Sequence, residues 1–175
     1  MSEDLKKYIR SVKDFPKPGI MFRDITTILK DPVPFKLAAR LLFENAEHLD
    51  INKVVGIESR GFIFGPLLSE KLDAGFIPIR KPGKLPAETV KETYSLEYGT
   101  DSIEIHKDAI QPGDKVLLHD DLLATGGTAE AACKLIEKLG GKVMQISFII
   151  ELSFLKGRDK LKKYNVVSLV DYDSE

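Results

Sequence analysis

This 175-residue chain has only one cysteine and three histidines, and its net charge is close to zero. The single cysteine, Cys133, excludes an internal disulfide, and one cysteine with three histidines forms no pattern typical of a zinc site. The chain has 26 basic and 27 acidic side chains, a net charge of −1. This balance argues against a general nucleic-acid-binding protein, but it permits a local basic site for a small anion.

Long apolar runs are absent as well. No run approaches the roughly 20 residues that a membrane-spanning helix needs, and residues 1–10 lack the apolar core of a signal peptide. We therefore expect a cytoplasmic protein whose partners include neither a membrane nor a nucleic acid.

The apolar residues that are present suffice for one packed core. Hydrophobic side chains make up 43% of the chain, and its length suits one domain, so we expect a single domain over residues 1–175. Short apolar runs typical of strands alternate with segments whose apolar residues recur at helical spacing. This alternation predicts an α/β fold with a central, mainly parallel sheet covered by helices on both faces. The expected strands are 54–57, 75–79, 115–120, 143–150 and 166–170, and the expected helices are 31–46, 62–72 and 126–139.

The remaining segments are expected to be shorter or irregular. Residues 5–12 suit a short helix, and the prolines and glycine of 14–23 are typical of a shaped loop. Residues 81–92 are interpreted as a basic loop. Polar and apolar residues alternate in 93–98 and 102–106, which predicts a hairpin.

Polar and charged residues follow three of the expected strands, at 58–60, 81–84 and 120–128. Parallel sheets bind ligands in the loops outside the carboxyl ends of their strands. The sequence therefore predicts that these three segments meet in one ligand site.

The most specific of the three segments begins with two acids, Asp120 and Asp121, and continues into a turn of small residues, 124–128, that opens a helix. Small residues let backbone N–H groups close around an anion, and the helix N-terminus adds free donors. Two carboxylates beside such a cradle would repel a bare polyphosphate, but they suit hydroxyl groups or a divalent cation. A phosphorylated sugar supplies both phosphate and hydroxyls. The segment has neither a Walker A pattern nor a dinucleotide-binding Gly-x-Gly-x-x-Gly pattern.

The run from Asp120 to Thr128 resembles the phosphoribosyl pyrophosphate motif of type I phosphoribosyltransferases. Its Leu-Leu-Ala-Thr-Gly-Gly-Thr part, 122–128, is similar to that of the adenine-specific branch. The resemblance implies the type I phosphoribosyltransferase fold, with helices flanking a mainly parallel sheet, an N-terminal hood over about residues 1–34 and a mobile β-hairpin lid. It implies that Asp120 and Asp121 bind the ribose. The residues implied for the 5-phosphate are Ala124, Thr125, Gly126, Gly127 and Thr128.

Two segments nearer the N-terminus resemble the same family. Residues 15–26 are similar to the hood, which implies that Phe22 and Arg23 border adenine. Without the resemblance, Phe22 would be interpreted as a core aromatic residue.

Residues 58–65 resemble the family's pyrophosphate loop, which has a cis peptide bond that does not involve proline. The resemblance implies that Ser59 and Arg60 contact the pyrophosphate. The alternative for Arg60 is a surface ion pair with Glu58.

Residues 80–86 and 94–99 resemble the mobile lid. The resemblance implies that Lys81 and Lys84 bind the pyrophosphate and that Glu97 handles the proton of adenine as the catalytic residue. It also implies that Arg80 acts at the dimer interface, in its own subunit or in the partner.

Residues 151–158 resemble the family's closing segment, in which Leu152 would pack on the purine. Plain core packing is the alternative for Leu152. His119 precedes the acid pair, where the family more often has an apolar residue; strand alternation predicts that it points away from the ligand, and it has no assigned role.

Taken together, these resemblances imply a purine salvage enzyme that transfers 5-phosphoribosyl from phosphoribosyl pyrophosphate to adenine, giving AMP and pyrophosphate. They imply a homodimer and a Mg²⁺ ion held mainly by phosphoribosyl pyrophosphate and water, with no metal ligand assigned to the protein. Two alternatives stay open. One is transfer to another purine base, and the other is a regulator of the same fold that binds the ligand without catalysis.

Overall fold

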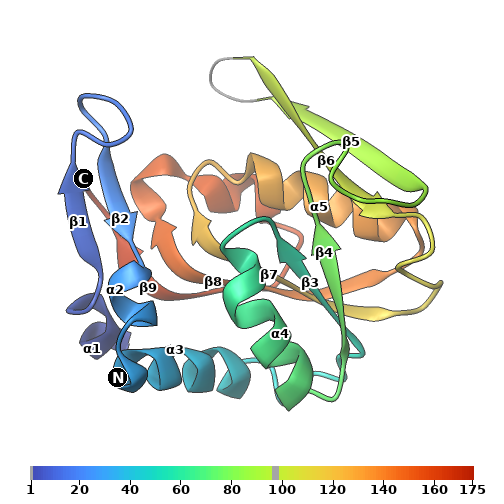
Figure 1. The fold of residues 1–175 in the computed structure, drawn as a ribbon, viewed down its shortest axis with the longest axis horizontal. Helices are drawn as coiled ribbons and strands as arrows, with labels where there is room; N and C mark the ends of the chain where they lie inside the picture. The colour runs from blue at the N-terminus through green and yellow to red at the C-terminus, as the bar shows by residue number, and fades with distance from the viewer. Residues whose placement is uncertain (1, 96–98) are drawn as a thin grey trace.

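Parallel strands form the central sheet of the protein (Figure 1). A computed structural model describes residues 2–95 and 99–175. The strands span Lys53–Ile57 (β3), Gly75–Ile79 (β4), Lys115–Leu123 (β7), Lys142–Leu152 (β8) and Val166–Tyr172 (β9). Their order is β4-β3-β7-β8-β9, and each neighbouring pair is parallel. This arrangement confirms the predicted fold class.

Helices cover both faces of the sheet (Figure 1). On one face lie α3 (Pro32–Glu44) and α4 (Gly61–Lys71). On the other face α5 (Gly127–Lys138) packs beside an antiparallel hairpin of β5 (Thr89–Ser95) and β6 (Thr100–His106). The Asp31 side chain begins α3 as predicted, because its Oδ1 accepts a hydrogen bond of 2.9 Å from the backbone N–H of Val33.

Alternation along β7 assigns its side chains to two separate cores. Leu117 packs in the cluster formed with α3 and α4, whereas Leu118 packs in the cluster formed with α5 and β6. His119 lies on the same face as Leu117, where its ring centroid is 6.4 Å from that of Phe64. Its Nδ1 is 2.9 Å from Ser147 Oγ, and complete burial lowers the pKa of its imidazole to about 4. His119 is therefore a neutral core residue.

The N-terminal segment differs from the prediction. Instead of one helix over residues 5–12, the chain forms α1 (Ser2–Lys6) and then β1 (Arg10–Lys13). β1 pairs with β2 (Met21–Asp24), which lies partly in the expected loop. The prediction was wrong because pairing across the turn gives β1 backbone bonds that its local pattern does not reveal.

The hairpin is also longer than predicted, because β5 begins at Thr89, inside the segment interpreted as a loop. It is in register with β6 from Thr89 opposite His106 to Ser95 opposite Thr100. The remaining short elements are α2 (Thr26–Leu29) and the 3₁₀ helices η1 (Ser153–Leu155) and η2 (Gly157–Leu161). None of the helices in the described part of the chain is long and apolar enough to cross a membrane.

Candidate active site

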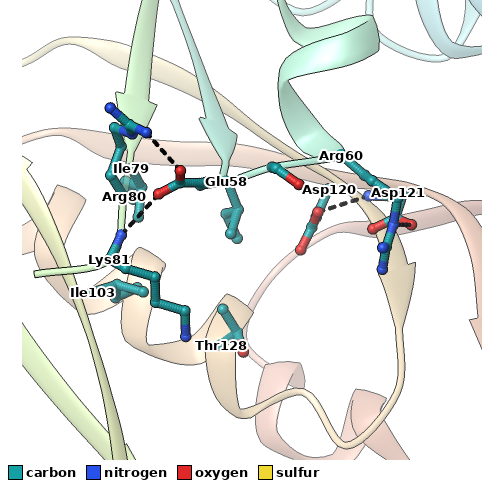
Figure 2. Close-up of a pocket in the computed structure, with 11 residues that line it drawn as sticks. Glu58, Arg60, Ile79, Arg80, Lys81, Ile103, Asp120, Asp121 and Thr128 are labelled. Atoms are coloured by element: carbon teal, nitrogen blue, oxygen red, sulfur yellow. Dashed lines mark hydrogen bonds and ion pairs between the residues drawn. The ribbon is translucent and has the colours of Figure 1, made fainter. Parts of the chain in front are cut away.

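Residues at the carboxyl ends of β3, β4 and β7 meet at one edge of the sheet, as predicted. They surround a cavity of about 260 Å³. Figure 2 shows side chains from all three strand ends around this cavity, with Lys81 extending toward Thr128. The lining residues are Ile57, Glu58, Ser59, Arg60, Ile79, Arg80, Lys81, Ile103, Asp120, Asp121 and Thr128. β7 extends to Leu123, so Asp120 and Asp121 lie inside this strand rather than after it.

Glu58 organises the end of β4. Arg80 Nη2 donates to Glu58 Oε1 at 2.6 Å, and the backbone N–H of Lys81 donates to Glu58 Oε2 at 3.1 Å (Figure 2). The hydrogen bond from Arg80 lowers the pKa of the Glu58 carboxyl despite partial burial. The peptide bond between Glu58 and Ser59 is cis, as the resemblance implied. Arg80 thus has a partner within its own chain, beside the cavity.

Arg60 pairs with Asp121 rather than with Glu58. Its Nε donates to Asp121 Oδ2, and the Asp121 side chain is only 8% exposed. Burial alone would lower the pKa of the Arg60 guanidinium, but the neighbouring carboxylates of Asp121 and Asp120 raise it instead. Arg60 stays a cation, held at the centre of the site.

Asp120 is the second carboxyl of this pair. Its Oδ1 accepts a hydrogen bond of 2.9 Å from the backbone N–H of Asp121. Burial raises the pKa of Asp120 well above its usual value, and the nearby charge of Asp121 raises it further. Burial and the neighbouring carboxylate therefore disfavour negative charge on Asp120.

The small-residue turn forms a second cavity, of about 200 Å³, next to the first. Gly126 has φ of 78°, which suits glycine, and α5 begins immediately after it. The backbone N–H groups of this helix start lie beside the cavity, an arrangement that favours an anion. All five predicted residues line it: Ala124, Thr125, Gly126, Gly127 and Thr128.

The hairpin reaches Thr128, which lines both cavities, through Tyr94. Thr128 Oγ1 donates to Tyr94 Oη at 3.2 Å, and Tyr94 Oη donates to Asp101 Oδ2 at 3.2 Å. Lys81 Nζ forms an ion pair with Asp101. Burial would lower the pKa of Lys81, but Asp101 and Tyr94 raise it. Sequence reasoning assigned no role to Tyr94 or Asp101. They face each other across the hairpin, but the contacts of Tyr94 with Thr128 and of Asp101 with Lys81 join distant segments.

Two predicted residues of the lid are not placed in this cavity. Among the described residues that line it, Lys81 is present and Lys84 is not. Lys84 is exposed, and its carbonyl oxygen accepts a hydrogen bond of 3.1 Å from Arg80 Nη1. Glu97 lies outside the described residues.

A third cavity, of about 420 Å³, lies under the hood. Phe22 and Arg23 both line it, and Arg60 lines it too, with its guanidinium carbon 5.6 Å from the centroid of the Phe22 ring. The hood contacts β9 through a cation–π interaction, in which the Arg23 guanidinium carbon lies 3.9 Å from the centroid of the Tyr172 ring. Leu152 packs at the edge of the core cluster around α3, in agreement with its alternative interpretation.

Arg60 is shared by the three cavities, so they form one connected site. An anion cradle, a carboxylate pair, a basic cavity and an aromatic-lined cavity meet around this guanidinium. The site can hold a phosphorylated sugar with a second anionic group on one side and a flat apolar ring on the other.

Comparison with known proteins agrees with this geometry. A family model described as the phosphoribosyl transferase domain matches residues 24–174, which places the chain in the phosphoribosyltransferase class. A solved adenine phosphoribosyltransferase from Thermoanaerobacter pseudethanolicus is 50% identical, with a TM-score of 0.95, covering 98% of this chain and 100% of that one. The Saccharomyces cerevisiae enzyme of that name, solved with an imino-altritol bisphosphate and adenine, is 44% identical, with a TM-score of 0.89, covering 96% of this chain and 97% of that one.

A curated adenine phosphoribosyltransferase from Christiangramia forsetii is 62% identical over 169 residues, which cover 97% of this chain and 99% of that protein. The chain belongs to the adenine phosphoribosyltransferase family.

Proposed function

We propose that the protein transfers the 5-phosphoribosyl group from phosphoribosyl pyrophosphate to adenine, giving AMP and pyrophosphate. The observation that carries the proposal is the meeting of three chemically different cavities at Arg60. The reaction needs a place for a phosphate, a place for a diphosphate and a place for a purine, all within reach of one sugar carbon.

In this proposal the sugar is held by the phosphate loop, residues 124–128, and by the carboxylate pair of Asp120 and Asp121. Backbone N–H groups and hydroxyls of 124–128 bind the 5-phosphate, and Asp120 and Asp121 accept hydrogen bonds from the ribose hydroxyls. Such fixed contacts accelerate the reaction by holding the reacting atoms in position. Hydroxyl donors at Asp120 would favour its charged form and so oppose the effect of burial, which raises its pKa.

The basic cavity receives the leaving group. Ser59, Arg60, Lys81 and Lys84 bind the pyrophosphate, and Arg60 and Lys81 already face the cavity. Lys81 must exchange its ion pair with Asp101 for one with the diphosphate. Preorganised positive charge lowers the barrier, because negative charge develops on the departing oxygen.

A Mg²⁺ ion, when bound, would supply further charge neutralisation on the pyrophosphate. Mg²⁺ prefers oxygen ligands and usually keeps several waters, which fits binding mainly through substrate oxygens. Asp120 and Asp121 are carboxylates beside the cavity that would face such an ion.

In the chemical step one bond breaks, one bond forms and one proton is transferred. The bond from C1 of the ribose to pyrophosphate breaks, the bond from C1 to N9 of adenine forms, and N9 loses its proton, which Glu97 receives. Phe22 and Arg23 border the adenine under the hood, and Leu152 is proposed to pack on it. The adenine in the complex of the yeast relative supports adenine as the base.

Base selectivity tests the proposal directly. Adenine, hypoxanthine and guanine, each radiolabelled and supplied with phosphoribosyl pyrophosphate and Mg²⁺, are compared by the rate of nucleotide formation. We expect adenine to react far faster than the other two. A comparable rate with guanine would favour the alternative of another purine base, and binding without turnover of any base would favour the non-catalytic regulator.

We also propose that the protein is a homodimer, as the family resemblance implies. The resemblance implies that Arg80 acts at the dimer interface, and Arg80 lines the active-site cavity, so the proposed interface lies next to the site. Light scattering on an active preparation at micromolar concentration should give about twice the mass of 19.5 kDa. A monomeric mass in a fully active sample would contradict the dimer.

A further inference from the structure

The chain that leaves β8 packs against the outer side of the phosphate loop. A methyl group added to Gly126 would collide with the carbonyl oxygen of Gly157, and one added to Gly157 would collide with the carbonyl oxygen of Ala124. Two backbones are therefore in direct contact, with no side chain between them. A shift of Gly157 toward residues 124–126 would therefore displace them.

Gly157 is held in place by its neighbour Arg158. Arg158 Nε donates to Glu151 Oε1 at 2.6 Å, and Arg158 Nη2 donates to Glu151 Oε2 at 2.7 Å. Arg158 Nη1 also donates to the carbonyl oxygen of Val166 at 2.9 Å. The fork of one guanidinium thus ties η2 to both β8 and β9.

Glu151, which accepts both hydrogen bonds from the Arg158 guanidinium, is itself held in place. It is only 4% exposed, and its Oε2 also accepts a hydrogen bond of 2.6 Å from Ser168 Oγ. Burial would raise the pKa of Glu151, but the bonds from Arg158 and Ser168 lower it, so the carboxylate stays charged. Bidentate pairs of this kind fix geometry as well as adding energy.

We propose that Arg158 is a positioning residue for the phosphate loop, acting through its fork on Glu151 and through the contact of Gly157 with Ala124 and Gly126. The inference deepens the proposed function, since it rests on 124–128 being the 5-phosphate site. Arg158 does not itself touch the phosphate. It holds the backbone whose N–H groups do.

The test measures the two anion sites of the full-length protein separately, by calorimetric titration with ribose 5-phosphate and with pyrophosphate. Arg158→Met removes the fork, and Arg158→Lys keeps the charge but not the bidentate geometry. We expect Arg158→Met to weaken ribose 5-phosphate binding at least about tenfold, the effect of losing one hydrogen bond to a charged group. Pyrophosphate affinity should stay within about twofold, and Arg158→Lys should restore part of the loss.

Lys163→Met is the matched control. It removes another ion pair of this region, with Glu137 on α5, whose two side chains are 65% and 39% exposed and do not line the phosphate cavity. Its affinity for ribose 5-phosphate should be unchanged. If Arg158→Met does not fold because Glu151 is left charged and buried, the double variant Glu151→Gln, Arg158→Gln removes both charges and should show the same selective loss.

Two results would overturn the proposal. One is unchanged ribose 5-phosphate affinity in the Arg158 variants, and the other is an equal loss of both affinities, which indicates general loosening of the fold. Failure of the proposed function is seen differently, as wild-type protein that binds ribose 5-phosphate but does not convert adenine.

Discussion

Replacing Asp121 with alanine is expected to weaken the binding of phosphoribosyl pyrophosphate about 10- to 150-fold, since a hydrogen bond to a charged group contributes about 1.5–3 kcal/mol. The variant loses an acceptor for a ribose hydroxyl. It also leaves Arg60 without the carboxylate that holds it between the three cavities. Turnover should fall together with affinity, because the sugar is no longer held in position.

Asp121→Asn is the matched variant for this experiment. It keeps an oxygen for Arg60 and for the hydroxyl but removes the charge, so its loss of affinity should be smaller than that of Asp121→Ala. Titration calorimetry measures the affinity, and thermal unfolding shows whether each variant is folded. Full affinity in a folded Asp121→Ala protein would exclude Asp121 from the ribose site.

Replacing Glu97 with alanine is expected to slow the chemical step while leaving affinity for phosphoribosyl pyrophosphate within a few-fold. A positioned acid or base typically contributes about 10²–10⁴-fold to the rate, and the loss should fall in that range. The rate is expected to fall without a matching loss of affinity because, in the proposed role of Glu97, adenine N9 loses its proton only as the new bond forms. An interaction made only in the transition state changes the rate and not the binding of the ground state.

Single-turnover measurements are required for the Glu97 variant, because slow product release would hide a loss of chemistry in steady-state rates. Glu88→Ala is the control, because Glu88 is an acid that immediately precedes β5. Its side chain is 84% exposed, and an exposed ion pair such as its 3.3 Å contact with Lys107 contributes little. Glu88→Ala should react at the wild-type rate. If Glu97→Ala does so as well, adenine loses its proton to water and Glu97 is not catalytic.

Parts of the site that lie within one short stretch of sequence were predictable. The segment 116–128 combines an apolar strand, two acids, small residues and a helix start in 13 consecutive positions. Each feature has a local physical reason, so the pattern alone indicated a phosphorylated sugar. The clustering of 58–60 and Lys81 around this loop was also predictable, since parallel strands end at the same edge of a sheet.

Contacts between distant segments were less predictable. Arg60 follows Glu58 closely in the sequence, yet its partner is Asp121, which only the order of β3 and β7 brings near. The pairing of Lys81 with Asp101 depends on where the hairpin lies over α5. The bidentate ion pair of Arg158 with Glu151 joins residues on either side of η1. The composition of that segment does not predict how its backbone runs.

The sequence by itself determined the class of fold, the strands and helices of the sheet layer, and the type of ligand, because periodicity and turn chemistry act over a few residues. The tertiary structure decided the strand character of 10–13, the neutral state of His119 and the meeting of three cavities at Arg60. These properties depend on burial and on partners far along the chain. Burial and such partners exist only once the sheet has formed and its two faces have been covered.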